Sequence, residues 1–589
     1  MNAARRWVLR FLLAWACSFA YLFITYYPVA SISYAHHDQY RYFAPTGPDR
    51  QAAKAVRTTD PQWRWLRLIG RPVAAELEYQ IFKRVTVVDD LTPIRVIGIG
   101  LYAMAMAIAI CFLLELGLSA VVAFCLGGAL FTLPAVQFSV YIASFNHPVA
   151  HILALTSAAL IRLGSRVSAD DPHWYRNPRR IVCHTVAIAL LVVALLSYAP
   201  SAFVVLFPIA AEIAFKGIAG WPATRRHLIR DVFLTGLACI VYFAIIRHNF
   251  IAHGGHEFQS YKIEVNGDVT HRLLRIPLDL MLPALNLWSV HAKWRIAAVM
   301  ACLLASGLGL ALLREFRAVP RSKLRLVQST WNCFLGRAVV QYTKYAQRFG
   351  RYLQLVAAIT LILFFSEATY FAAPTTMSLY RMHFAFGGLI VLLFAGTAAC
   401  WGRLIPTPWR HKAALALACV VLGSAGLRAH ANVLKNCLND RLELSFVSAQ
   451  ISAHAAEPIH RVHIIQPHAT TYSFNGQRKV LTSEEFNVPT SDCPPSVAYM
   501  GCAAMLNVFD PDSFIAVTPL HTLEAISAVD PNSVAITYSA HGEPVIPSPG
   551  MIVIDMDQLL RVAAPSKLTA LFGPATARNS APSTAPRAY

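Results

Sequence analysis

The sequence has few charged residues for its length. They make up 14% of the 589 residues, whereas hydrophobic residues make up 56%. A soluble globular protein carries about 25% charged residues, so this deficit excludes a water-soluble protein of ordinary composition. The sequence also lacks a glycine-rich phosphate-binding loop, which argues against ATP hydrolysis by this chain. It shows no internal repeat of the kind common in transporters.

The hydrophobic residues are concentrated in long blocks that are almost free of charge. The centres of four such blocks are Ile94–Leu114, Ile181–Leu196, Val232–Ile246 and Leu353–Phe365. With their weakly polar flanks most of these blocks reach about 18–24 residues, and a helix of that length crosses a hydrocarbon core of about 30 Å. The sequence therefore predicts a polytopic membrane protein.

Acidic residues are fewer than basic ones, and the net charge is +20. The Lys and Arg residues lie in alternate connections between the apolar blocks. Cytoplasmic loops retain positive charge during insertion, so this alternation explains the excess without nucleic-acid binding. The basic segment Arg5-Arg6 with Arg10 puts the N-terminus in the cytoplasm.

We predict an α-helical polytopic fold with about eleven transmembrane helices, in the inner (cytoplasmic) membrane of a cell. The expected helices cover residues 11–32, 94–114, 118–137, 147–163, two helices that meet at Tyr198-Ala-Pro-Ser, 231–249, a helix ending at Leu313, 352–371, a helix ending before Arg403, and 413–427. This count puts the C-terminal region on the external, periplasmic side, and residues 1–430 form the membrane domain.

The composition changes after the last helix. Short runs typical of β-strands alternate with helix-like segments and turn residues. These runs are Arg461–Gln466, Phe514–Val517, Val534–Tyr538 and Met551–Ile554. We expect a small external α/β domain over 431–573, followed by a tail rich in Pro, Ala and Ser over 574–589 that is typical of disorder.

The first external loop has the most informative polar residues. Directly after the first helix, the segment Ser33-Tyr-Ala-His-His-Asp-Gln-Tyr-Arg-Tyr-Phe43 puts Asp38 among histidines and aromatics near the membrane surface. Further along, Trp63–Arg71 and Ala74–Arg84 have the pattern of helices lying in the interface. Asp38 fits either a solvated loop carboxylate or a functional acid.

Together these features resemble the GT-C superfamily of membrane glycosyltransferases, which use polyprenyl-phosphate-linked sugars. Several of its families carry an acidic motif after the first helix, matched here by Asp38-Gln39-Tyr40-Arg41-Tyr42, with Gln39 in place of a second acid. Ser144-Phe-Asn-His-Pro148 stands in the later external loop that often holds another acid. The motif Gly70-Arg71-Pro72 is similar to one in the bacterial GtrII-type O-antigen glucosyltransferases. Ser366-Glu367, followed by Tyr380-Arg381, also resembles bacterial members of the superfamily.

The resemblance implies transfer of a sugar from a polyprenyl-phosphate donor to an envelope glycan or lipid acceptor on the external face. Asp38 would then be the catalytic base, because a carboxylate can accept the proton of an attacking hydroxyl. Basic residues would bind the phosphate, although each also fits contact with lipid headgroups. The expected substrate-binding residues are His37, Tyr40, Arg41, Arg71, Glu78, Asn146, His147, Lys262 and Arg381. Glu76 and Glu78 fit either a second acid or the polar face of an interfacial helix.

No cofactor is required by this interpretation. Two groups, His36-His37-Asp38 and His253-Gly-Gly-His256-Glu257, have ligands suitable for a divalent metal but no specific known spacing. Two other classes remain open: a transporter or flippase for lipid-linked glycans, and a non-catalytic membrane scaffold whose outer domain binds a partner. Few charges lie centrally in the helices, which disfavours transport.

Overall fold

The structure is a computed structural model. It describes residues 3–35, 66–67, 70–82, 85, 88–166, 177–252, 276, 280–288, 294–317, 331–368, 383–453, 461–465, 471–474, 477–480, 535–539 and 545–555. The chain divides into two compact units, one with Met1–Ser33 and Ala52–Lys435 and the other with Tyr34–Gln51 and Asn436–Tyr589.

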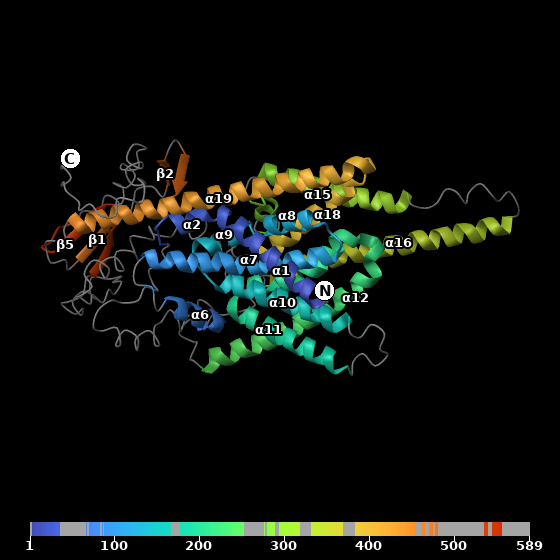
Figure 1. Ribbon diagram of the computed structural model, residues 1–589, viewed down its shortest axis with the longest axis horizontal. Coiled ribbons are helices and arrows are strands. Elements are labelled where there is room, and N and C mark those ends of the chain that lie inside the picture. The colour runs from blue at the N-terminus through green and yellow to red at the C-terminus, as the bar shows by residue number, and fades with distance from the viewer. Residues whose placement is uncertain are drawn as a thin grey trace. The chain divides into compact units, whose positions relative to one another are not determined.

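The first unit is built from helices that run side by side (Figure 1). Those before the middle of the chain are α1 (Ala3–Thr25), α2 (Tyr27–Ser31), α6 (Pro72–Phe82), the short 3₁₀ turn η1 (Val88–Asp90), α7 (Leu91–Glu115), α8 (Ala120–Leu130), α9 (Pro134–Tyr141), α10 (Asn146–Arg166), α11 (Pro178–Ala202), η3 (Phe203–Leu206) and α12 (Phe207–Ala252). Those that follow are α14 (Leu282–Leu285), α15 (Trp294–Arg317), α16 (Trp331–Ser366), α18 (Phe384–Gly402) and α19 (Thr407–Ala453).

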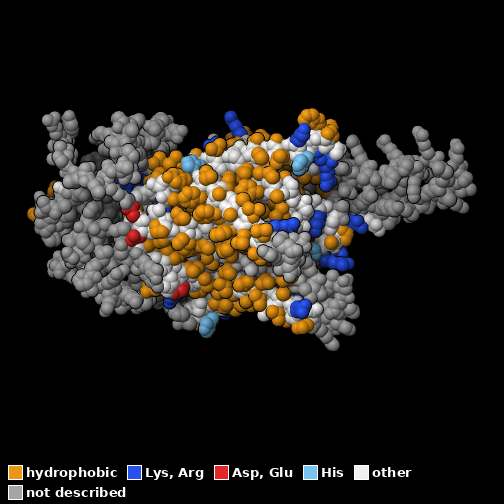
Figure 2. Space-filling view, in the orientation of Figure 1, with side chains coloured by type: hydrophobic (Ala, Val, Ile, Leu, Met, Phe, Trp, Pro, Cys, Tyr) orange, Lys and Arg blue, Asp and Glu red, His pale blue; other side chains and the backbone are white. Residues whose placement is uncertain are grey.

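The helical unit has the surface of a membrane protein. Hydrophobic side chains cover its middle, while Lys and Arg gather toward its right-hand end in Figure 2 and acidic residues are seen at the other end. In the described part of the chain, eight helical segments are long and apolar enough to cross a membrane, or nine if a bent pair counts as one. The segments are Trp7–Thr25, Val88–Glu115, Asn146–Ser165, Pro178–Gly217, Gly220–Asn249, Phe349–Ser366, Phe384–Gly402 and Thr407–Leu438. The prediction of a helical, multi-pass membrane protein is confirmed.

Two predicted helices are shaped differently in the structure. The span expected over 118–137 is divided into α8 and α9, which meet at an angle of 64°. Leu133 is extended because it precedes Pro134, and a proline cannot donate a backbone hydrogen bond. Side chains satisfy carbonyl groups freed at the break: Gln137 donates to the carbonyl of Thr132 (2.7 Å), Tyr26 to Phe131 (2.9 Å) and Trp288 to Ala129 (2.8 Å). The short helix expected over 413–427 belongs to the much longer α19.

Two bends shape the centre of the unit. At Tyr198, α11 leaves helical geometry (φ −155°, ψ 97°) near the interior Pro200, where the sequence predicts a turn between two helices. At Gly217, α12 turns sharply with φ 56° and ψ −150°. That conformation is essentially restricted to glycine. The bend at Tyr198 brings polar residues of α11 to the start of α10. The bend at Gly217 brings charged residues of both arms of α12 to the end of α10.

The second unit contains strands after α19. β1 (Arg461–Ile465) pairs in parallel with β4 (Ala535–Ser539) and β5 (Met551–Asp555), in the order β4-β1-β5. β2 (Thr471–Phe474) and β3 (Gln477–Val480) form a separate antiparallel pair. Three of the four predicted β-runs are therefore strands, and the fourth, Phe514–Val517, lies outside the described residues. In β5 alternate residues are buried, as expected for a sheet covered on one face.

Candidate functional site

A buried carboxylate connects the first long loop to the start of α10. Glu78, on α6, is only 8% exposed. The side-chain amide of Asn146 donates a hydrogen bond to its Oε1, and the hydroxyl of Ser144 lies 3.5 Å from the same oxygen. A buried carboxylate requires such donors, because leaving it without partners in an apolar surrounding is costly. Its neighbour Glu76 faces solvent and pairs with Arg67 at 3.9 Å.

The next residue of α10 contacts the bend in α11. The ring of His147 lies against that of Tyr198, with centroids 3.8 Å apart. Nδ1 of His147 is 3.3 Å from the hydroxyl of Ser201, and Ser197 donates to the carbonyl of Asn146 at 3.1 Å. The departure of Tyr198 from helical geometry therefore brings an aromatic ring and two hydroxyls of α11 to the first turn of α10.

Arg71 reaches the same ring from the loop. Its guanidinium carbon is 4.6 Å from the centroid of Tyr198. Gly70, which precedes it, has φ +87°, and a Cβ there would be 2.5 Å from Ile246. Both the backbone conformation and the tight packing thus call for glycine, which explains its place directly before Arg71. A guanidinium held over an aromatic face keeps N–H donors available for a phosphate.

We call these residues the Glu78 cluster: Arg71, Glu78, Ser144, Asn146, His147, Ser197, Tyr198 and Ser201. Four residues singled out from the sequence, Arg71, Glu78, Asn146 and His147, belong to it although two separate segments supply them. The other predicted residues, Asp38, His37, Tyr40, Arg41, Lys262 and Arg381, lie outside the described residues, as do His36 and the His253–Glu257 segment.

A second buried acid lies where α18 begins. Glu367 follows α16 and is 1% exposed, and its Oε1 is 3.0 Å from Nδ1 of His383, which caps α18. Burial raises the pKa of Glu367 above its ordinary value, although the neighbouring His383 partly opposes that shift. The pair joins the two ends of the segment that contains Tyr380-Arg381, a part of the resemblance noted in the sequence.

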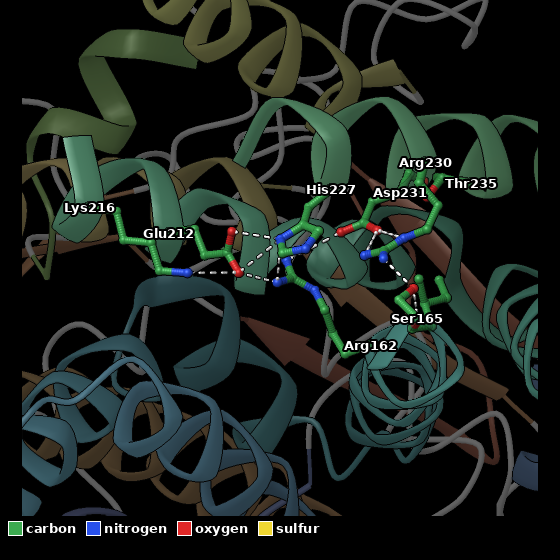
Figure 3. Close-up of polar contacts among 9 residues, drawn as sticks. Arg162, Ser165, Glu212, Lys216, His227, Arg230, Asp231 and Thr235 are labelled. Carbon is green, nitrogen blue, oxygen red and sulfur yellow. Dashed lines mark hydrogen bonds and ion pairs between the residues drawn. The ribbon is translucent and has the colours of Figure 1, made fainter. Parts of the chain in front are cut away.

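The opposite end of α10 carries a network of charged side chains (Figure 3). We call it the Arg162 cluster: Arg162, Ser165, Glu212, Lys216, His227, Arg230 and Asp231. Arg162 and Asn146 are sixteen positions apart on one helix, which corresponds to about 24 Å. The two clusters are therefore separated by most of the thickness of a bilayer core.

The Arg162 cluster connects both arms of α12 to α10. One nitrogen of Arg162 pairs with Glu212, before the Gly217 bend, and another lies 3.4 Å from Asp231, after it. Nδ1 of His227 is 3.0 Å from Oε2 of Glu212, so this contact also crosses the bend. Glu212 and Asp231 are almost fully buried, with side chains 4% and 6% exposed. Each buried carboxylate therefore has a cationic partner.

Sequence reasoning treated the basic members of this cluster as cytoplasmic loop charges and did not identify the network. Glu212 and Asp231 were the available signal, because each is a lone acid in or beside an apolar helical run. Such acids are rare in membrane helices and mark paired or functional positions. The sequence also did not single out Ser197, Ser201 or His383 as members of a site.

Comparison of the chain with known protein families, curated proteins and solved structures finds no match.

Proposed function

We propose that the protein is a GT-C-like glycosyltransferase that moves a sugar from a polyprenyl-phosphate donor to an envelope glycan or lipid acceptor. The observation that supports it best is the Glu78 cluster. It combines a buried carboxylate, Glu78, held by Asn146, with a guanidinium and an imidazole that both lie against the ring of Tyr198, at an end of a membrane bundle. The phosphate and the anomeric carbon of a lipid-linked sugar lie at the membrane surface, which an end of such a bundle reaches.

The reaction needs a proton acceptor and a stabilised leaving group. The acceptor hydroxyl forms a bond to the anomeric carbon as the bond from that carbon to the phosphate oxygen breaks, and the hydroxyl proton passes to a carboxylate. The polyprenyl phosphate leaves with the electron pair, and its charge is stabilised by Arg71. From the sequence we assign proton acceptance to Asp38, with Glu78 as the second carboxylate. The Tyr198 ring, which His147 contacts, holds the guanidinium of Arg71 in place.

The reaction is proposed to occur on the external face. The basic end of the bundle, which includes Arg162 and the Arg225-Arg226 pair, is assigned to the cytoplasm because retained loops carry positive charge. The Glu78 cluster then faces the periplasm. A reporter that is active only when exported should be active when it is fused near Ser580. Activity of a cytoplasmic reporter there would mean that the helix count is off by one and that the C-terminal region is cytoplasmic.

The enzymatic test uses membranes containing the full chain and a panel of labelled polyprenyl-phosphate hexoses and pentoses. Asp38→Asn keeps size and hydrogen bonding but cannot accept the proton, so turnover should fall by about two to four orders of magnitude. Glu78→Gln should lower turnover as well. Glu76→Gln is the matched control, because that exposed glutamate lies on the same helix and should leave turnover near the wild-type value.

Two results would overturn the proposal. One is a folded wild-type protein that consumes none of the donors in the panel. The other is a set of well-folded Asp38→Asn and Glu78→Gln variants with turnover like that of Glu76→Gln, which would remove both carboxylates from the chemistry. Loss of activity in Asp38→Asn alone would support Asp38 as the base and leave Glu78 as a positioning residue.

A further inference from the structure

A cavity of about 300 Å³ adjoins the Arg162 cluster, at the end of α10 remote from the Glu78 cluster. Its walls come from the last turn of α7, the end of α10 and both arms of α12. They are lined by Phe112, Glu115, Leu116, Arg162, Ser165, Pro208, Glu212, Lys216 and His227. This volume is at the lower end of the range for small-molecule sites and is ample for a phosphate group.

The polar part of the wall has two carboxylates, Glu115 and Glu212, and three basic side chains, Arg162, Lys216 and His227. Glu212 already interacts with Arg162, Lys216 and His227. Lys216 has three N–H donors, and the structure pairs its nitrogen with Glu212 at 3.5 Å. Nδ1 of His227 is directed at Glu212, which leaves Nε2 on the other side of the ring.

The surroundings favour an anion attached to an apolar group. Arg225 and Arg226 are exposed on the same arm of α12 as His227. Phe112, Leu116 and Pro208 supply an apolar wall next to the donors. Arg, Lys and imidazole N–H groups are the usual partners of phosphate oxygens in proteins.

We propose that this cavity binds a phosphate group, using Lys216 and His227 as donors. The group can belong to the headgroup of a lipid in the adjacent leaflet or to a soluble phosphate compound. The cavity does not depend on the glycosyltransferase assignment, because it lies about 24 Å along α10 from the Glu78 cluster.

The test measures binding to the full-length protein in detergent by native mass spectrometry, with short-chain phosphatidic acid, short-chain phosphatidylcholine and inorganic phosphate as probes. Phosphatidic acid should bind saturably. Lys216→Gln and His227→Gln should each weaken it about tenfold, the value of one charge-assisted hydrogen bond. Lys216→Arg should retain binding. Lys216 is 40% exposed, so its replacement leaves the fold intact.

Arg225→Gln is the matched control, because Arg225 is exposed on the same arm of α12 but does not line the cavity. Binding that falls equally in Arg225→Gln and Lys216→Gln would mean general attraction to a basic surface and would overturn the proposal, as would the absence of saturable binding by any probe. Inorganic phosphate that competes fully with phosphatidic acid would assign the site to soluble phosphates. Lipid binding that resists phosphate would assign it to a headgroup.

Discussion

The two ends of α10 are polar for different reasons. At its start, the Glu78 cluster consists of one carboxylate held by neutral donors and a set of ring contacts, with its members drawn from a loop helix and a helix bend. At its end, the Arg162 cluster consists of paired full charges on three helix segments. Neutral donors hold a carboxylate without cancelling its charge, whereas opposite charges do cancel. The first arrangement suits chemistry on a charged carboxylate. In the second, the paired charges of Arg162, Glu212 and Asp231 suit fixing the fold.

The largest expected effect of this difference is on stability at the Arg162 cluster. Arg162→Met removes the shared partner of Glu212 and Asp231, although Lys216 still pairs with Glu212 and Arg230 with Asp231. Removing one partner of a buried pair destabilises a protein by about 3–5 kcal/mol, and we expect about 3 kcal/mol here because other cations remain. The free energy of unfolding in detergent, from denaturant titration, measures the loss. Glu78→Gln should change stability by less than about 1 kcal/mol, because the amide oxygen still accepts from Asn146.

Two further variants sharpen this prediction. Adding Glu212→Gln to Arg162→Met should recover part of the stability, since one of the two buried charges that lost Arg162 is gone. Arg225→Gln, at an exposed position, should stay within about 0.5 kcal/mol of wild type. An Arg162→Met protein as stable as wild type would mean that water already reaches the two acids, and the contrast between the ends of α10 would then disappear.

A smaller effect is expected at the bend that closes the Arg162 cluster. Gly217 has φ 56° and ψ −150°, and a Cβ there would meet nothing within 4 Å. Gly217→Ala therefore tests backbone strain without a steric clash, and we expect a destabilisation of about 1–3 kcal/mol. Gly236→Ala is the control, because that glycine is helical and equally open. It should be neutral or stabilising by up to about 1 kcal/mol. Equal effects at both glycines would contradict the strain argument.

The sequence predicts much of the Glu78 cluster and little of the Arg162 cluster. Gly70-Arg71-Pro72, Glu78 and Asn146-His147 could be selected because polar residues are conspicuous in loops and at helix starts near the membrane. The turn at Tyr198 was also predictable, from the proline beside it. In contrast, counting Lys and Arg assigns a side of the membrane to Arg162 and Arg230 but says nothing about their partners. Which acid meets which base depends on how α10 and the arms of α12 pack.

Packing between helices also explains why the helix expected over 118–137 is divided in the structure. Hydropathy measures the transfer of single residues into lipid, so it finds apolar length but misses a break that the fold itself satisfies. The division of 118–137 at Leu133 is tolerated because Gln137, Tyr26 and Trp288 donate to carbonyls there. Two of these three donors are remote in sequence. A local pattern around Pro134 could suggest a bend but could not identify what stabilises it.

The smallest effect concerns pH and the buried acid at the start of α18. Burial raises the pKa of Glu367 above its ordinary value, with His383 partly opposing. The folded state therefore favours the protonated carboxyl, so its stability should decrease as pH rises from the ordinary carboxyl range through the raised pKa. Glu367→Gln cannot titrate but still accepts a hydrogen bond from His383. The unfolding temperatures of Glu367→Gln and of wild type are compared in detergent between pH 4.5 and 8. The difference, variant minus wild type, should increase as pH rises. Glu76→Gln, which alters an exposed acid, should follow wild type throughout. A Glu367→Gln curve parallel to wild type would mean that His383 fully offsets the burial of the charge, and the pair would then resemble the matched charges of the Arg162 cluster.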